Sequence, residues 1–172
     1  MQPKTELLMN DQQQFRDAMA RLSAAVTVIT TDGASGKRGM TATSVCSVTD
    51  TPPTVLVCIK QSALMNHAVK NNKQVCINIL DASQKNLAKQ FAGELVNYKN
   101  DNFTDSQWIS CKHHQFAPYS TQALVCVHGE INQIVEIGTH SVFFVLVQKI
   151  NIQTDSDALL YYQRQYKKLA LK

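Results

Sequence analysis

The first hydrophobic pattern along the chain has a helical period. The apolar positions that carry it are Phe15, Met19 and Leu22. Their spacing places them on one face, so we expect an amphipathic helix over residues 11–22, capped by Asn10 or Asp11. We expect residues 1–9 to form a flexible N-terminus.

Strand patterns follow this helix. The run AVTVITT, residues 25–31, is rich in β-branched residues and predicts a strand. DGASGKRG is the clearest turn in the chain, so residues 25–31 and 39–48 should form a hairpin. A third strand is expected at residues 54–60, where the preceding Pro-Pro suits a sheet edge or a turn.

Two short helices are predicted in the middle of the chain. Ser62 can cap the helix of SALMNHAVKNN, and Ser83 can cap a second helix that ends at Gly93. Glycine is a normal left-handed terminator of a helix. The run QVCINIL, residues 74–80, predicts a strand between the two helices.

The second half of the chain is dominated by long strands. Residues 94–118 show no clear period and are expected to be mostly loop. Residues 123–137 and 140–153 predict two strands joined by a tight Gly-Thr-His turn. Residues 158–163 predict a last strand, followed by a basic tail.

These elements amount to six or seven strands with short helices between them. Because regular β-α-β alternation is absent, a doubly wound parallel sheet is disfavoured. Long strands joined by hairpins favour a closed antiparallel barrel. The chain has 172 residues and no visible linker or repeat, so we expect one domain over residues 1–172.

Composition narrows the class of protein. Hydrophobic residues make up 44% of the chain and charged residues 17%, which is typical of a globular core. No apolar run approaches the roughly 20 residues needed to span a bilayer. The N-terminus also lacks the basic and apolar regions of a secretory signal. We therefore expect a cytoplasmic protein that makes no membrane contact.

Cysteine usage agrees with a reducing compartment. The five cysteines are Cys46, Cys58, Cys76, Cys111 and Cys126. Their number is odd and no two form a CxxC pair, which favours free thiols over a disulfide framework. The net charge of +4 is modest and the basic residues are scattered. Nucleic-acid binding would need a denser basic stripe with exposed aromatic residues.

Motifs for common catalytic chemistry are missing from the sequence. There is no GxSxG elbow, no cysteine in a Cys-His context and no carboxylate pair suited to glycoside hydrolysis. P-loop and GxGxxG motifs are absent as well. Cys111, His113 and His114 are the one candidate metal cluster. No second ligand pair has matching spacing, so we expect no metal.

The segment from Gly39 to Lys60, GMTATSVCSVTDTPPTVLVCIK, is the candidate ligand platform. Both faces of its first strand carry hydroxyl and apolar groups, a mixture that suits a flat ring with polar edges. The helix start at Ser62 would add backbone N–H groups and a hydroxyl beside the Lys60 ammonium, as a phosphate site requires. The alternative is an ordinary hairpin strand facing water, with a serine cap beside a solvated lysine.

At these residues the chain resembles the flavin reductase-like family. The resemblance runs from FRDAMARLSAAVTVITT through GMTATSVCSVTDTPPTVLVCI, CINIL, FAG and IGTH to LLYYQRQY. It implies a mainly β fold: a six-stranded antiparallel split β-barrel of Greek-key type that binds FMN, with short flanking helices.

The resemblance also implies an activity. A family member of this kind is a homodimeric NADH:flavin oxidoreductase that reduces FAD or FMN, with NADPH as a possible donor. Hydride passes from nicotinamide C4 to flavin N5, so no protein acid or base is needed. The reduced flavin then diffuses to a separate oxygenase that hydroxylates an aromatic compound of the 4-hydroxyphenylacetate type. A non-enzymatic flavin carrier and an oxidase with tightly bound FMN are the alternatives.

Carried over residue by residue, the family pattern implies a flavin site. The residues expected to line the isoalloxazine ring are Met40, Thr41, Ala42, Thr43, Ser44, Val45, Cys46 and Ser47. Those expected to hold the ribityl chain and phosphate are Cys58, Ile59, Lys60, Ser62 and Asn66. Phe91 and Ala92 are expected to border the flavin or its adenylate arm.

The remaining expected site residues lie near the C-terminus. His140 closes a turn that reads Gly-Asp-His in many relatives and is linked there to nicotinamide nucleotide binding. In this chain Thr139 replaces the aspartate, so that hydrogen bond is in question. Arg164 and Tyr166 match positions near the cofactor. The alternatives are a histidine bonded to backbone at a strand start and a solvated charge in the tail.

Overall fold

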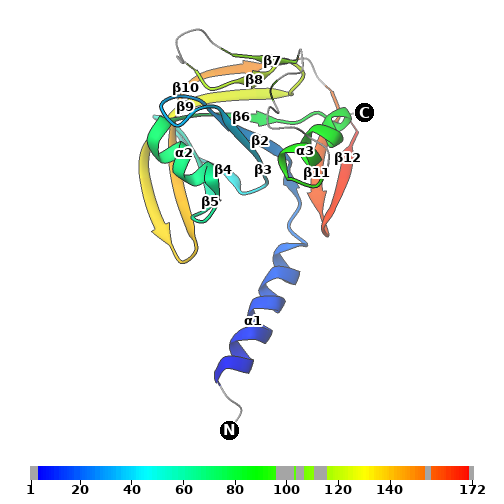
Figure 1. Ribbon diagram of the computed structural model, residues 1–172. Helices are drawn as coiled ribbons and strands as arrows, with labels where there is room; N and C mark the ends of the chain where they lie inside the picture. The colour runs from blue at the N-terminus through cyan, green and yellow to red at the C-terminus, as the bar shows by residue number, and fades with distance from the viewer. Residues whose placement is uncertain (1–3, 96–102, 104–106, 111–115, 154–155, 171–172) are drawn as a thin grey trace.

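The main body of the protein is one curved antiparallel sheet (Figure 1). The computed structural model describes residues 4–95, 103, 107–110, 116–153 and 156–170, and side chains from residue 11 onward. The strands of the sheet are β2 (Thr27–Thr31), β3 (Arg38–Ala42), β4 (Val45–Asp50), β5 (Pro53–Lys60), β6 (Gln74–Ile79), β9 (Val125–Ile137) and β10 (His140–Ile152). Their order across the sheet is β3-β2-β6-β9-β10-β5-β4. The predicted antiparallel, mainly β fold is confirmed, with seven strands in this sheet instead of six.

The two edges of the sheet are joined by a very short link. β3 and β4 lie at opposite edges, yet only Thr43 and Ser44 separate them along the chain. An extended chain gains at most ~3.6 Å per residue, so the sheet must curl until its edges meet. The Cys58 N–H donates to the Ser44 carbonyl at 3.1 Å and fastens the link to β5. The prediction of one continuous strand over residues 39–48 was therefore wrong.

A small second sheet packs beside the main one. It consists of β1 (Ala24–Ala25), β11 (Ala158–Tyr162) and β12 (Gln165–Leu169). The predicted strand 25–31 is divided at Val26, because Val26 bonds across to the second sheet. Its N–H donates to the Leu159 carbonyl at 2.9 Å. The predicted basic tail was wrong, since those residues form β12 and pair with β11.

The first helix differs from its prediction in position. α1 spans Lys4–Met19, so Asn10 and Asp11 lie inside the helix and do not cap it. Figure 1 shows α1 projecting away from the sheets. Its end is tied to the β11–β12 turn by the Gln163 N–H, which donates to the Ala20 carbonyl at 2.7 Å. The flexibility of residues 1–9 stays a prediction.

The two short helices exist, but neither predicted serine caps them. α2 spans Leu64–Asn72; its N-cap is Ala63, and no side chain bonds to that end. A short 3₁₀ turn, η1 (Ala82–Gln84), leads into α3 (Lys85–Phe91). Asp81 caps η1 by accepting a hydrogen bond from the Ser83 N–H at 2.7 Å. Gly93 has the expected left-handed backbone, with φ of +75°.

Most of the long strands match the predicted boundaries within two residues. β5, β6, β9 and β10 all form, and β9 and β10 pair across the tight turn at Gly138. The predicted loop at 94–118 lies largely outside the described residues. Within it the structure places β7 (Trp108–Ile109), which pairs with β8 (Tyr119–Ser120).

Two apolar clusters support the sheet. The first lies between the sheet and α2 and contains Ile29, Val57, Ile59, Met65, Val69, Val75, Ile77, Phe143 and Val145. The second lies under α3 and contains Val26, Val28, Leu80, Leu87, Ala88, Phe91, Trp108 and Leu159. Together they hold β3 between α2 and α3.

The cysteine and membrane expectations can be compared with the structure in part. Cys46, Cys58, Cys76 and Cys126 are free thiols, but only Cys76 and Cys126 are buried. Cys111 lies outside the described residues. In the described part of the chain, none of the helices is long and apolar enough to cross a membrane. The cytoplasmic location stays a prediction.

Gly39 provides a test of packing at the start of β3. A Cβ atom there would lie 2.5 Å from Cε1 of Phe91, whose ring is buried against Phe103 and Trp108. We expect Gly39→Ala to lower the free energy of unfolding by about 1–3 kcal/mol, the usual effect of overpacking. Urea denaturation measures this. In the double variant Gly39→Ala/Phe91→Leu, the loss in free energy of unfolding should be smaller than the sum of the losses in the two single variants. A double-variant loss equal to that sum would contradict the proposed clash.

Candidate functional site

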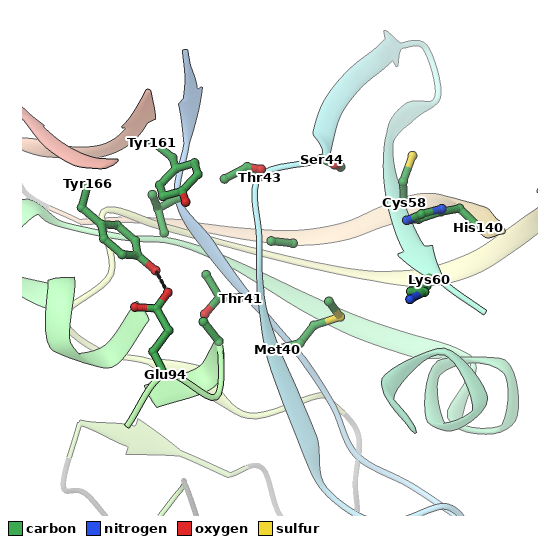
Figure 2. Close-up of a pocket in the computed structure, with 13 residues that line it drawn as sticks. Met40, Thr41, Thr43, Ser44, Cys58, Lys60, Glu94, His140, Tyr161 and Tyr166 are labelled. Atoms are coloured by element: carbon green, nitrogen blue, oxygen red, sulfur yellow. Dashed lines mark hydrogen bonds between the residues drawn. The ribbon is translucent and has the colours of Figure 1, made fainter. Parts of the chain in front are cut away.

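A cavity of about 320 Å³ lies where the β3–β4 link passes β5 (Figure 2). The strands β3, β5, β10, β11 and β12 and the segment after α3 all contribute to its walls. The lining residues are Val26, Met40, Thr41, Ala42, Thr43, Ser44, Cys58, Lys60, Ala92, Glu94, His140, Tyr161 and Tyr166. The cavity thus depends on the curling that brings both sheet edges together.

The two ends of the cavity differ in charge. Figure 2 shows Cys58, Lys60 and His140 at one end and Glu94 with Tyr166 at the other. Lys60 and His140 are direct neighbours across the β5–β10 ladder. A ligand in this cavity therefore meets a cation at one end and a carboxylate at the other.

Tyr166 and Glu94 form a hydrogen-bonded pair. The Tyr166 hydroxyl donates to Oε1 of Glu94 at 3.2 Å, and its ring packs edge-to-face on Tyr161 with centroids 5.2 Å apart. Burial, together with the negative charge of Glu94, raises the pKa of Tyr166 to about 12. The hydroxyl is thus a neutral donor at physiological pH.

Cys58 presents a neutral thiol to the cavity. Burial raises the pKa of this thiol above its usual value. The thiolate is the reactive form of cysteine, so burial makes this side chain a weaker nucleophile than an exposed cysteine. Cys58 instead provides a small, polarisable surface between the link and Lys60.

The imidazole of His140 is oriented by its neighbour in the turn. Nδ1 of His140 lies 2.9 Å from the Thr139 hydroxyl, and both side chains are exposed. Thr139 stands where the sequence resemblance leads one to expect an aspartate. Its hydroxyl therefore supplies a hydrogen-bond partner for the ring without adding a charge.

Threonine hydroxyls on β3 and on the neighbouring strand β2 hold the β3 part of the Gly39–Lys60 platform in place. The Thr41 hydroxyl donates to the Ala88 carbonyl of α3 at 2.6 Å. Thr27, on the neighbouring strand, donates to the Ala42 carbonyl at 2.7 Å. The Thr41 proton is thus engaged with α3 and is not available to a ligand. The surface offered by β3 consists mainly of Met40 and Ala42.

Comparison with known proteins identifies the family. The flavin reductase like domain matches residues 19–170 of the chain. The chain belongs to this family. FMN reductase (NADH) RutF of Acinetobacter baylyi is 44% identical over 156 residues, covering 91% of this chain and 81% of the relative. The 4-hydroxyphenylacetate 3-monooxygenase reductase component of Salmonella typhimurium is 40% identical over 158 residues and covers 92% of each chain.

A solved structure confirms the fold. The crystal structure of a putative flavin reductase from Haemophilus somnus superimposes with a TM-score of 0.83 at 36% identity. The match covers 91% of this chain and 98% of that one. The match agrees with the mainly β, split-barrel fold that the family resemblance implied.

The cavity of this flavin reductase-like chain has the size of a small-ligand pocket and walls with groups that suit a flavin. Small-ligand pockets usually fall between ~300 and 1,000 Å³, and this one is about 320 Å³. Met40, Ala42 and Val26 offer apolar surface for a ring. Lys60 offers a cation for a phosphate, while the Glu94 end suits groups that donate hydrogen bonds.

The structure brings most of the expected flavin-site residues to the cavity. Those that line it are Met40, Thr41, Ala42, Thr43, Ser44, Cys58, Lys60, Ala92, His140 and Tyr166. Those that do not line it are Val45, Cys46, Ser47, Ile59, Ser62, Asn66, Phe91 and Arg164. The second group divides into residues of the interior and residues elsewhere on the surface.

The interior residues serve the scaffold. Ile59 is buried in the cluster under α2, and Phe91 is buried against Gly39. Asn66 is buried as well, and its amide donates to the Ile59 carbonyl at 3.1 Å and to the Ser141 hydroxyl at 2.8 Å. These side chains support the cavity from behind, and their contact with a ligand stays a prediction.

The surface residues lie elsewhere. Val45, Cys46 and Ser47 belong to β4, beyond the link. Ser62 is exposed in the turn after β5. Arg164 forms an ion pair with Asp17 of α1 at 2.5 Å instead of facing the cavity. The role of Arg164 near the cofactor stays a prediction.

Three lining residues were missed at the sequence level. Val26, Glu94 and Tyr161 all reach the cavity. Glu94 directly follows the FAG motif, and Tyr161 lies inside LLYYQRQY, so the matched motifs pointed to both places in the chain. Val26 carried no such signal, because its position depends on where the chain leaves one sheet for the other.

Among the described residues no group of three metal-ligating side chains occurs; residues 111–114 lie outside them.

The raised pKa of Tyr166 makes a pH-dependent prediction. The folded pKa, about 12, is above the ordinary value of 10.0, so the stability that this hydroxyl contributes is fully present below pH 10. It is lost as the pH rises through about 12. We therefore expect Tyr166→Phe to be less stable than the wild type at neutral pH, with a difference that shrinks in that alkaline range.

Ultraviolet absorbance of tyrosinate measures the same group directly. The difference between the wild-type and Tyr166→Phe titrations should show a single tyrosine with a midpoint near pH 12. Tyr162→Phe, at an exposed neighbouring position, is the control. A Tyr166 midpoint at the ordinary value of 10.0 would contradict the pairing with Glu94.

Proposed function

We propose that this chain is an NADH-dependent flavin reductase that reduces FAD or FMN and supplies diffusible reduced flavin to a separate oxygenase. The observation that carries the proposal is the cavity at the barrel split, with Lys60 and His140 at one end and Glu94 at the other. The names of the relatives support it: one is an FMN reductase that uses NADH, and another is the reductase component of an aromatic monooxygenase.

Each wall of the cavity has a role in holding flavin. Lys60 binds the phosphate. Met40 and Ala42 form the apolar surface against which the ring lies, and the backbone of Thr43 and Ser44 borders its edge. His140 and its turn face the nicotinamide. Glu94 accepts hydrogen bonds from the uncharged end of the ligand.

The protein residues orient the reactants and perform no proton transfer of their own. Bound flavin supplies the redox chemistry by accepting a hydride from the reduced nicotinamide. Cys58 and Tyr166 stay neutral at physiological pH, as their raised pKa values require. Orientation is the main contribution left to the protein, and close stacking of two rings is an effective one.

Exposure of the cavity supports release of the product. Lys60, Ala92, Glu94 and His140 are all exposed, so the cavity is open along much of its rim. A ligand can enter and leave without movement of a buried element. This agrees with an enzyme whose reduced flavin acts elsewhere, and the oxygenase that hydroxylates a 4-hydroxyphenylacetate-type compound is the proposed recipient.

Steady-state turnover tests the proposal. Purified protein is mixed with NADH and an excess of FAD, FMN or riboflavin, and NADH absorbance is followed. We expect NADH loss far beyond the protein concentration. Stoichiometric bleaching of bound flavin followed by a stop would indicate a carrier or an oxidase with tightly held FMN. No NADH loss with any flavin would overturn the proposal.

Lys60→Met separates phosphate binding from chemistry in the same assay. We expect the flavin KM to rise about fivefold to tenfold for FMN, the scale of one charge-assisted hydrogen bond, with little change in kcat. Riboflavin has no phosphate, so its KM should stay nearly constant. Lys85→Met removes an exposed lysine on α3 and is the matched control. An equal change for FMN and riboflavin would remove Lys60 from the phosphate site.

The outer face of the sheet beside the cavity supports a homodimer. Leu56, Val142, Phe144 and Val135 share this face, opposite the buried Val57 and Phe143. All four side chains are partly exposed, and Val142 lies directly beside Cys58 of the cavity. A second copy of the chain would cover this apolar surface and extend the walls of the site.

Sedimentation velocity at micromolar concentration tests the dimer. One chain has a mass of 19.2 kDa, and we expect a species of twice that mass. Phe144→Glu should shift the population toward single chains, because a buried unpaired carboxylate is costly. Ile152→Glu, at the exposed far end of β10, is the control. A wild type that sediments as one chain would contradict the dimer.

A further inference from the structure

Glu136 lies at the centre of a hydrogen-bond network behind the His140 turn. Its carboxylate accepts hydrogen bonds from three separate elements. Nε2 of Gln61, after β5, donates at 2.6 Å; Nζ of Lys70, in α2, donates at 2.7 Å; and the Ser141 hydroxyl, in β10, donates at 2.7 Å. Glu136 itself is near the end of β9, so four elements meet at one side chain.

The carboxylate is charged at neutral pH. The hydrogen bonds from Lys70 and Ser141 lower the pKa of Glu136 below its usual value. Both carboxylate oxygens face donors, an arrangement that a neutral amide cannot reproduce. In Glu136→Gln one accepting oxygen becomes an NH₂ group. This group would face the N–H donor of Gln61 or Lys70 and has no lone pair to accept from it.

A chain of contacts leads from Glu136 to the imidazole of His140. Glu136 holds the Gln61 side chain, and the backbone N–H of Gln61 donates to the Thr139 carbonyl at 3.0 Å. The Gln61 side chain also donates to the His140 carbonyl at 3.3 Å. The Thr139 hydroxyl in turn lies 2.9 Å from Nδ1 of His140.

The strand ladder alone does not fix this turn. His140 is paired with Ile137 on one side and with Lys60 on the other, which places its backbone. Gly138 and Thr139 lie beyond the last rung, and Gly138 has φ of +55°. The orientation of the ring therefore depends on Thr139, whose carbonyl is held by Gln61. Lys60, by contrast, is held by the β5–β10 ladder without help from Glu136.

We infer that Glu136 is a positioning residue for the nicotinamide-facing turn, acting through Gln61 and Thr139 on the ring of His140. This inference rests on the proposed function, because it assigns His140 to the electron donor. It predicts that a change at Glu136 affects the binding of the two substrates differently. Loss of the carboxylate disturbs recognition of NADH and leaves flavin binding at Lys60 intact.

Glu136→Gln tests the inference against a matched control on the same strand. We expect the KM for NADH to rise about tenfold, the scale of a lost hydrogen bond to a charged group. The Kd of FMN, from flavin fluorescence, should change by less than about twofold, since the ladder still holds Lys60. Glu136→Asp should recover part of the loss. Glu130→Gln, which removes an exposed glutamate earlier in β9, should behave as the wild type.

A double-mutant cycle with His140→Ala identifies the route. If Glu136 acts through the ring, Glu136→Gln has no further effect on the NADH KM once His140 is alanine. An equal effect in both backgrounds, or a KM unchanged by Glu136→Gln alone, would overturn the inference. Circular dichroism melting separates these outcomes from simple unfolding.

Hydrogen exchange gives a readout that needs no turnover. Glu136→Gln should speed amide exchange in a peptide covering residues 136–142 and leave a peptide from β6 unchanged. If wild-type protein oxidised no NADH, the proposed function would fail while this measurement still tested the network. Unchanged exchange in the turn would overturn the positioning role whatever the activity.

Discussion

The structure depends on one short link between the edges of a sheet. β3 and β4 are as far apart as two strands of the main sheet can be in pairing order, and two residues join them. This constraint forces the sheet to curl and places Thr43 and Ser44 in the wall of the cavity. It also brings Met40 and Ala42 of one edge close to Cys58 and Lys60 next to the other. The cavity is thus a direct consequence of the topology.

Charge then gives the cavity a direction. Lys60 and His140 are adjacent because β5 and β10 pair in register, while Glu94 reaches the cavity from the end of α3. The cation and the carboxylate therefore come from different elements that are packed independently. A change in α3 would therefore alter the Glu94 end of the cavity and leave the Lys60 end in place.

The sequence predicted the strands more reliably than it predicted the side chains that reach the cavity. Long runs such as those of β9 and β10 are defined by local alternation, so their boundaries needed no tertiary information. The break at Thr43 was missed because local pattern cannot show that a chain passes from one sheet edge to another. Asn66 was expected at the ligand from the family resemblance alone, and local pattern could not show that its amide bonds to Ile59 and Ser141 in the interior. Glu136 gave no local signal, since its partners come from three other elements.

The protonated state of Cys58 has a consequence for durability. Reduced flavin that meets oxygen generates peroxide, and peroxides oxidise thiolates far faster than thiols. Burial raises the pKa of this sulfur and so makes the vulnerable thiolate form scarcer. The same burial that shapes the wall of the cavity thus makes Cys58 less open to oxidation than an exposed cysteine.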